Sequence, residues 1–342
     1  GYRYDHRARL KRAAKMNRTG KDNMSVQFDI DNDGIATLTL DMPGRSMNVL
    51  NDDLTGPFKE AIERIENDDA IKGVVITSGK KDFLAGADID GVYAITDPAE
   101  AFRLAEDYKA FLRRLETCGR PVAAALNGTT LGGGLELALV CHYRVCLDEG
   151  RIKIGLPEVK LGLLPGGGGT QRLPRLIGIQ AALPLMLEGK ELDPSKAQQQ
   201  GIVNELASDR EQLVERAKRW CLENPKAIQP WDDKKFKWPG GDSKSPANGQ
   251  LWAIAPSMAS TKSWGNYPAI THIQSCVFEG GIVEDREANL AMRAQNAHMI
   301  LMSEGGEIPE PAAGRPVCML PTGRKCAGAG VECVLVSCLP GS

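Results

Sequence analysis

The chain has 342 residues, which is enough for one large domain or two ordinary ones. Hydrophobic residues make up 42% and charged residues 25%, a composition that is typical of a soluble globular protein and excludes a wholly disordered chain. The 42 Lys and Arg residues nearly balance the 44 Asp and Glu residues, so the net charge of −2 does not indicate a nucleic-acid-binding protein. Glycine interrupts each apolar run before it reaches the roughly 18 residues of a membrane span, which excludes a transmembrane protein.

The cysteines and histidines do not form the pattern of a disulfide framework or a metal site. Five of the nine cysteines lie separately in apolar segments and predict free thiols in a reducing, cytoplasmic compartment, whereas the other four crowd the last 25 residues. The first five are Cys118, Cys141, Cys146, Cys221 and Cys276. The four histidines are too scattered for a zinc-binding helix and there is no CxxC pair, so we expect no metal ion.

Residues 1–23 differ in character from the rest of the chain. They carry eight Lys or Arg residues and only two acids, with almost no apolar periodicity. Such a segment is either a targeting or nucleic-acid-binding arm or a disordered leader outside the fold, and we favour the leader. Met24 is the expected start of the folded part.

The folded part is predicted to begin with a hairpin and a helix. Residues 26–31 and 35–40 flank an Asp-Gly turn, which is a strong hairpin signal. Apolar residues then recur at helical spacing after Asn51, a favourable N-cap. Residues 73–78 indicate a buried strand.

Strands and helices continue to alternate as far as residue 223. A capping-box-like start at Asp97 and Glu100 predicts a helix through Leu115, and a strand at 121–126 runs into a glycine triplet and an apolar helix. Short strands are expected at residues 143–147 and 151–154, and helices near residues 170–176, 179–188, 194–199 and 208–223, the last with Ser208 as its N-cap. This alternation predicts an α/β fold in which helices pack on sheets.

The remaining third of the chain is predicted to be helical and then irregular. Residues 224–243 are rich in Pro, Lys, Trp and Gly and indicate a connection. Three helices are expected at residues 248–259, 269–278 and 284–302. After residue 304 the pattern dissolves into Gly, Pro and Cys.

Three local features carry the chemistry because they occur together. The sequence FLAGADI at residues 83–89 is a turn of small residues directly after a strand. NGTTLGGGLEL at residues 127–137 places free backbone N–H groups at a helix start, where they can hold an anion, and sets Glu136 in the first turn. LPEVKLGLLPGGGGT at residues 156–170 sets a second carboxylate, Glu158, ahead of a glycine-rich turn.

Each feature alone also has a purely structural interpretation. Small residues allow close packing, and an acid at a helix start complements the helix dipole. A carboxylate flanked by apolar residues is equally a place where a raised pKa and acid–base chemistry are expected. Other glycine motifs do not fit, since the chain has no Walker motif, no dinucleotide-binding spacing at Gly166 and Gly168, and no GxSxG elbow.

Taken in order, the segments AGADI, NGTTLGGGLELAL and LPEVKLGLLPGGGGTQRLPRLIG resemble the enoyl-CoA hydratase/isomerase (crotonase) superfamily. The resemblance covers residues 25–206 and continues more weakly to residue 294. It is closest to the hydratase part of bacterial multifunctional fatty-acid oxidation enzymes, in which a 3-hydroxyacyl-CoA dehydrogenase part follows. It implies an α/β fold of ββα units wound as a spiral, followed by C-terminal helices.

The resemblance also implies roles for particular residues. The catalytic carboxylates fall on Glu136 and Glu158, the oxyanion-hole N–H groups on Ala87 and Gly133, and the N–H group that positions the catalytic water on Gly166. The strips that contact CoA fall on Met47, Asn48, Val49, Ala85, Gly86, Asp88 and Ile89. The implied function is the hydration of trans-2-enoyl-CoA to 3-hydroxyacyl-CoA in fatty-acid β-oxidation. The alternatives are a Δ3-Δ2-enoyl-CoA isomerase, an inactive CoA-binding fragment of a multifunctional enzyme, and an RNA-binding relative that uses the basic leader.

The expected organisation is a leader at residues 1–23, a catalytic core at 24–206, a helical region with a linker at 207–302 and an unstructured tail at 303–342. The tail contains GxG at residues 328–330, but Cys333 replaces the third glycine and the space is too short for a dinucleotide-binding unit. We therefore expect no NAD, no other redox cofactor and no metal. The expected partners are an acyl-CoA substrate and either further copies of the chain, as a homo-trimer or hexamer, or a missing dehydrogenase part, with no nucleic acid.

Overall fold

The computed structural model describes residues 24–282, apart from positions 90, 92–94, 96–97 and 264–267. The leader expected at residues 1–23, the helix expected at 284–302 and the tail expected after it lie outside the described residues.

The larger of two sheets has six strands in the order β1-β2-β3-β4-β6-β9. β1 and β2 form the predicted hairpin, and all the other pairs are parallel. The strands are β1 (Val26–Ile30), β2 (Ile35–Leu40), β3 (Gly73–Ser78), β4 (Val122–Leu126), β6 (Tyr143–Leu147) and β9 (Glu205–Ala207). Parallel strands require crossover connections, which are helical here, so the predicted α/β class is confirmed.

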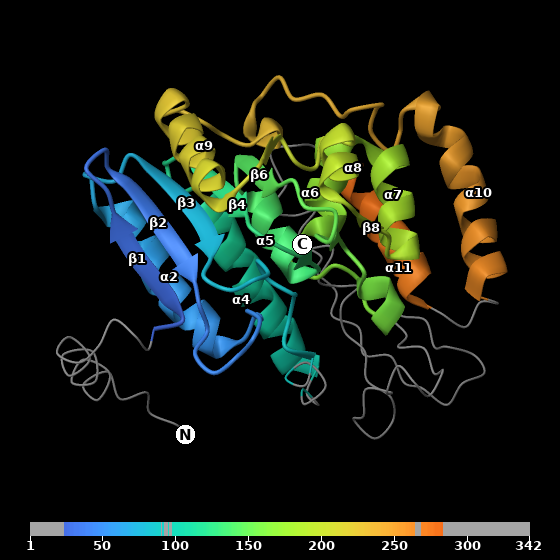
Figure 1. The fold of residues 1–342 in the computed structure, drawn as a ribbon. Coiled ribbons are helices and arrows are strands. Elements are labelled where there is room, and N and C mark those ends of the chain that lie inside the picture. Colours follow the sequence, from blue (N-terminus) through green and yellow to red (C-terminus); the bar gives the residue numbers. More distant parts are fainter. Residues whose placement is uncertain (1–23, 90, 92–94, 96–97, 264–267, 283–342) are drawn as a thin grey trace, which may run out of the picture.

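Helices cover both faces of this sheet (Figure 1). α9 (Arg210–Glu223) packs on β3, β4 and β6, whereas α2 (Asp52–Asn67) packs on β1 and β2 from the other side and touches α4 (Pro98–Glu116). All the side chains of β3 and β4 are accordingly buried. α2 begins after the predicted N-cap Asn51, whose side chain accepts a hydrogen bond from the N–H of Leu54.

The other helices lie beside the sheet, with α5 at the centre of Figure 1 and the rest towards its right. They are α5 (Gly133–Val140), α6 (Gly169–Ile177), α7 (Ile179–Glu188), α8 (Pro194–Gln199), α10 (Pro246–Ser263) and α11 (Pro268–Gly280), with short 3-10 turns η2 (Glu158–Leu161) and η3 (Pro230–Asp232). α11 packs on α6 and α7, so the C-terminal helices cover the segment that follows the second glycine-rich turn.

Two local predictions are wrong. Of the strand expected at residues 151–154, only Ile154 is in a strand, because the chain turns where the N–H of Ile152 donates to the carbonyl of Glu149 at 2.9 Å. The N-cap of α9 is Asp209 and not Ser208, since the Asp209 carboxylate accepts the N–H of Gln212 at 2.9 Å. The predicted free thiols are confirmed, for all five described cysteines are free and buried.

A small second sheet of three short strands, in the order β5-β7-β8, was not predicted. Its strands are β5 (Thr130–Leu131), β7 (Ile154–Gly155) and β8 (Glu191–Leu192). β5 leads directly into α5, which carries Glu136, and β7 leads into η2, which begins at Glu158. The pairing of β5 with β7 therefore brings the starts of α5 and η2 together. Among the described residues, no helix is long and apolar enough to cross a membrane, and no cluster of three or more His, Cys, Asp or Glu residues could hold a metal.

Candidate active site

The chain after β2 pairs with the loop after β3, and this pairing leaves the N–H group of Ala87 without a partner in the paired segment. The N–H of Leu50 donates to the carbonyl of Gly86 at 2.8 Å, and the N–H of Asp88 donates to the carbonyl of Leu50 at 3.1 Å. In a parallel pairing the residue directly opposite does not bond to its neighbour, so the N–H of Ala87 points away from Leu50. No described residue accepts a hydrogen bond from the Ala87 N–H.

A second free N–H group belongs to Gly133, the first residue of α5. The first N–H groups of a helix have no acceptor within the helix, and within the described part of the chain that of Gly133 has none elsewhere. A Cβ atom at Gly133 would lie 3.8 Å from the nitrogen of Ala87, so the two peptide groups are neighbours. Together they can hold an oxygen that gains negative charge.

Glycine is needed at the start of α5 because the helix approaches two other segments closely. A Cβ atom at Gly133 would lie 2.4 Å from Cδ1 of Leu50, and one at Gly134 would lie 2.2 Å from the carbonyl oxygen of Leu84. Any larger residue would force α5 away from the Ala87 loop. The glycine triplet therefore sets the spacing of the two N–H groups.

Glu136 lies in the first turn of α5, with 3% of the residue exposed. Its Oε1 accepts the N–H of Gly169 at 2.7 Å. Burial raises the pKa of Glu136, while hydrogen bonding from the backbone of Gly169 and Gly167 opposes the rise. The positive charges of Arg172 and Lys109 oppose it as well. Two backbone N–H groups and two positive charges therefore stabilise the ionised form of Glu136.

Glu158 opens η2, and the support for its ionised form is limited to a hydrogen bond from its own backbone. Its Oε2 is buried without a hydrogen-bond partner among the described residues. Burial and then the negative charge of Glu136 raise the pKa of Glu158 well above its usual range. A Cβ atom at Gly132 would lie 3.3 Å from Oε1 of Glu158, so this carboxyl group lies against the glycine triplet that leads to Glu136. The pKa values of both carboxyl groups are raised, and the rise is larger at Glu158, so Glu136 is the more readily ionised of the two.

Two side chains of α4 also reach the site, and neither was identified from the sequence as more than part of a helix. The hydroxyl of Tyr108 donates to the carbonyl of Gly133 at 3.4 Å, and burial and the charge of Glu136 raise the pKa of Tyr108 well above its usual value. Lys109 is 4% exposed, and its Nζ lies 3.1 Å from Glu106. Burial lowers the pKa of Lys109 to about 8. The available signal was a tyrosine and a lysine on the buried side of an amphipathic helix.

Asn48, expected to contact CoA, has a side chain that is fully occupied by the fold. It is completely buried, and its Nδ2 donates to the carbonyls of Leu40 and Phe83 and to the hydroxyl of Ser78 at 2.9–3.1 Å. Its Oδ1 accepts the N–H of Met42 at 3.0 Å. The side chain therefore fixes the loops that carry Ala87, and only its backbone could reach a ligand.

The other residues expected to bind CoA or water lie around the Ala87 loop and the second glycine-rich turn. Met47 and Ala87 are exposed, and Asp88 forms a surface ion pair with Arg45 at 2.9 Å. Val49, Ala85 and Ile89 are partly exposed, Gly86 is buried, and Gly166 is partly exposed in the turn before α6. Of these residues, Gly86 lies against the glycine triplet, since a Cβ atom there would lie 3.6 Å from the nitrogen of Gly133, and the N–H of Ala85 donates to the carbonyl of Asn48 at 3.1 Å.

Comparison with known proteins agrees with this geometry. Residues 31–230 match the family described as enoyl-CoA hydratase/isomerase. The fatty acid oxidation complex subunit alpha of Idiomarina loihiensis is 40% identical over 285 residues, which cover 81% of this chain and 39% of the relative. The subunit of the same name from Shewanella frigidimarina is 42% identical over 275 residues, or 78% of this chain and 38% of the relative. The chain thus spans about two-fifths of the length of these relatives.

Solved structures show the same fold. The enoyl-CoA hydratase from Thermoplasma volcanium superposes with a TM-score of 0.54 at 25% identity, over 78% of this chain and 96% of that one. A probable enoyl-CoA hydratase/isomerase from Mycobacterium abscessus gives 0.52 at 31% identity, over 60% of this chain and 78% of that one. Since the family match covers more than half of the sequence, the chain belongs to the enoyl-CoA hydratase/isomerase family and has its α/β crotonase fold.

Proposed function

We propose that the chain hydrates trans-2-enoyl-CoA thioesters to 3-hydroxyacyl-CoA, and that it does so in fatty-acid oxidation. The observation that carries the proposal is the pair of buried carboxyl groups, Glu136 and Glu158, beside two N–H groups for which the described residues supply no acceptor. The names of the relatives, which are subunits of a fatty acid oxidation complex, support the metabolic setting.

The proposed chemistry needs one base, one acid and a site for a developing negative charge. Glu136, kept ionised, removes a proton from water as its oxygen attacks the β-carbon of the enoyl group. The electrons move onto the thioester oxygen, where the N–H groups of Ala87 and Gly133 stabilise the enolate, each by about 3 kcal/mol in comparable sites. Glu158, kept protonated, then delivers its proton to the α-carbon.

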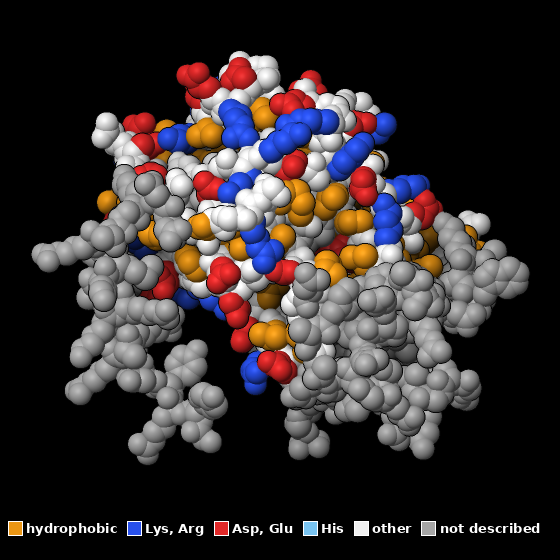
Figure 2. Space-filling view, turned by 60° about the horizontal axis from the view of Figure 1, so that its bottom comes forward, with side chains coloured by type: hydrophobic (Ala, Val, Ile, Leu, Met, Phe, Trp, Pro, Cys, Tyr) orange, Lys and Arg blue, Asp and Glu red, His pale blue; other side chains and the backbone are white. Residues whose placement is uncertain are grey.

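Surface character supports an amphiphilic substrate. Figure 2 shows a face on which hydrophobic side chains gather around a hollow near its middle, with Lys and Arg side chains close by. A fatty acyl-CoA combines an apolar chain with an anionic nucleotide, so adjoining apolar and basic surface suits both of its ends. We propose no NAD or metal requirement for the reaction, because water addition needs neither.

The second candidate is isomerisation of a Δ3 double bond to Δ2, which the family description includes. Double-bond migration needs a single proton shuttle and no held water. The buried, unpartnered carboxyl group of Glu158 alone could supply that shuttle.

The deciding experiment follows the ultraviolet absorbance of the conjugated enoyl thioester with crotonyl-CoA and a long-chain enoyl-CoA in parallel. Loss of absorbance with the unaltered chain, abolished in the Glu136→Gln/Glu158→Gln double variant, is the expected result. A 3-enoyl-CoA that gains this absorbance would identify isomerase activity. Acyl-CoA binding with neither reaction would leave the inactive CoA-binding fragment as the correct description.

A further inference from the structure

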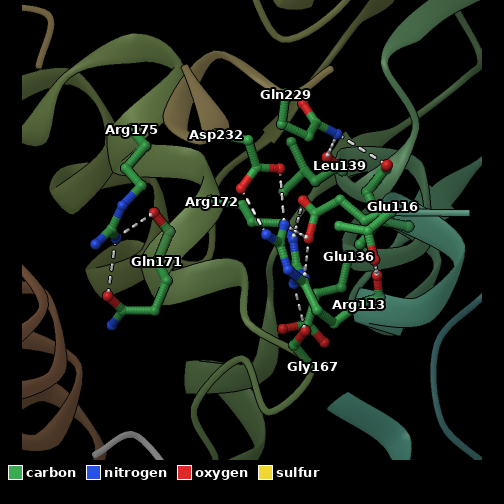
Figure 3. A network of polar contacts seen from close by, with 12 residues as sticks. Arg113, Glu116, Glu136, Leu139, Gly167, Gln171, Arg172, Arg175, Gln229 and Asp232 are labelled. Atoms are coloured by element: carbon green, nitrogen blue, oxygen red, sulfur yellow. Dashed lines mark hydrogen bonds and ion pairs between the residues drawn. The ribbon is translucent and has the colours of Figure 1, made fainter. Parts of the chain in front are cut away.

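A chain of alternating charges, partly exposed at Arg113 and Asp232 and buried at Glu116 and Arg172, lies near Glu136 (Figure 3). Arg113 on α4 donates to both carboxylate oxygens of Asp232 in η3, at 2.9 and 2.5 Å, and to Oε2 of Glu116 at 2.8 Å. Arg172 on α6 donates from Nε and Nη2 to the two oxygens of Glu116, both at 2.9 Å. Two arginines and two acids make this cluster neutral.

The burial of this cluster makes its position well defined. Glu116 is 2% exposed and Arg172 is 1% exposed. Burial alone would raise the pKa of Glu116, but the charges and hydrogen bonds of the two arginines bring it below its ordinary value. Removing charges from water is costly, and a buried ion pair is weak evidence for a role in stability. A role that needs a fixed arginine explains the cluster better.

The third donor of Arg172 connects the cluster to the active site. Its Nη1 donates to the carbonyl of Gly167 at 2.9 Å. Two residues later in the same turn, the N–H of Gly169 donates to Oε1 of Glu136 at 2.7 Å. All three donor groups of the guanidinium are therefore used, two on Glu116 and one on the turn that holds the candidate base.

We propose that Arg172 is a positioning residue for the hydration reaction. Anchored by Glu116, it holds the Gly167–Gly169 turn against Glu136, so that the carboxylate lies where it can accept a proton from water. This inference rests on the proposed hydratase function.

Several other charged or titratable groups face Glu136, and the test must separate them from Arg172. Lys109 and Tyr108 face it from α4, and Glu158 faces it from η2. Lys109 adds a second positive charge, whereas Glu158 is uncharged when its pKa is raised. Arg172 differs from them because it combines a positive charge with a hydrogen bond to the carbonyl of Gly167 in the turn.

The experiment compares Arg172→Met, Arg172→Lys and the double variant Arg172→Met/Glu116→Gln. In Arg172→Met the acidic limb of the pH profile of kcat/KM should move upward by about one pH unit or more, because Glu136 loses a neighbouring positive charge. Arg172→Lys should keep this limb near its original position but lower kcat, since an ammonium group cannot bond Glu116 twice and Gly167 at once. In the single variant Glu116 keeps only Arg113 as its partner; the double variant also removes the Glu116 charge and should show the same upward shift even if the single variant folds poorly.

Arg175→Met is the matched control. Arg175 lies on the same helix and is equally buried, but it donates to the carbonyls of Gln171 and Gly280, and Figure 3 shows it to the side of the Glu116 cluster. Its replacement should lower the temperature of unfolding without moving the acidic limb. An equal shift in Arg175→Met, or an unmoved limb in Arg172→Met and the double variant, would overturn the inference.

A second readout separates this inference from the proposed function. Carbon-13 labelling of glutamate carboxyls, with the Glu136 signal assigned from Glu136→Gln, follows the titration of Glu136 directly by NMR. An upward shift of that titration in Arg172→Met supports the positioning role even if the chain hydrates no enoyl-CoA. An unchanged titration in a chain that does hydrate enoyl-CoA refutes the role and leaves the function standing.

Discussion

Glu136 and Glu158 differ in what surrounds their carboxyl groups. Replacement by the isosteric glutamine tests whether each glutamate is catalytic or only structural. We expect Glu136→Gln or Glu158→Gln to lower kcat for crotonyl-CoA hydration by about 10²-fold or more, because each change keeps side-chain volume but removes proton transfer. The decrease in kcat of the double variant should be far smaller than the product of the two single decreases, since both groups act on one water.

Steady-state kinetics, acyl-CoA binding and thermal unfolding of these variants provide the check. Binding and folding should be retained. Near-normal hydration by either single variant would remove that glutamate from the mechanism. Isomerase activity, where present, should be lost mainly with Glu158.

The different pKa values of the two glutamates predict a bell-shaped pH dependence of kcat/KM. At low pH Glu136 gains a proton and can no longer act as a base, so activity falls. At high pH Glu158 loses its proton and can no longer act as an acid, and its raised pKa moves this second limb upward. The two pKa values belong to the coupled pair. A profile with a single acidic limb and a plateau up to pH 10 would show that no protonated carboxyl is needed.

Gly167 tests how closely the second glycine-rich turn fits Glu136. A Cβ atom there would lie 2.6 Å from Cε1 of Tyr108 and 2.8 Å from Oε2 of Glu136, so Gly167→Ala should displace the base. We expect kcat to fall by about 10²-fold, the scale of small misplacements of reacting groups. Gly150→Ala is the control, because no atom lies within 4 Å of a Cβ there, and its kcat should not change. Equal kinetics for the two variants would show that the turn tolerates movement.

The motif residues could be predicted from the sequence because each motif is contiguous. Glu136 and Glu158 stand within short, distinctive segments, and the structure places the carboxyl group of Glu158 against the glycine triplet that leads to Glu136. The contact between Arg172 and Glu116 could not be predicted in the same way, because 56 positions separate the two residues and each has the local sequence of an ordinary charged residue in a helix. Only the packing of α4 against the turn before α6 reveals their contact.

At the level of elements, Asn51 connects helix formation to the loop that carries Ala87. Its Oδ1 accepts the N–H of Leu54, and its neighbour Leu50 pairs with the loop that presents Ala87. We expect Asn51→Ala to lower the free energy of unfolding by about 1 kcal/mol, the usual effect of losing an N-cap. Asn51→Asp should retain most of that stability because a carboxylate also caps. Denaturant unfolding measures both, and equal losses would mean that the cap contributes nothing.

Elements with a strong local pattern match their predictions closely. The bounds predicted for β3, β6, α7 and α8 agree with those in the structure. The two-residue strands β5 and β8 were missed because two residues carry no periodicity, and their pairing is imposed by β7 between them. Ser208 and Asp209 are both good N-caps by type, so only the observed hydrogen bond to Gln212 distinguishes them.

At the scale of the whole molecule, the C-terminal helices support the active site from behind. Gln171 on α6 donates to the carbonyl of Cys276 at 2.8 Å, and Arg175 donates to that of Gly280 at 3.0 Å. Through these contacts α11 holds α6, the helix that begins at Gly169 beside Glu136. Loss of α11 should therefore affect catalysis as well as stability.

A comparison of chains ending at residue 245 and at residue 282 tests this support. Ile270, Ile273 and Val277 are buried, and burial of each contributes about 1.5–3 kcal/mol. Their combined loss is comparable with the net stability of about 5–15 kcal/mol of a typical domain. The shorter chain should therefore lose its cooperative thermal transition and its hydration of crotonyl-CoA, while the longer chain, which retains α10 and α11, should keep both. If the shorter chain unfolds at the same temperature and has the same kcat, α11 is not needed to hold α6 and the Gly167–Gly169 turn in place.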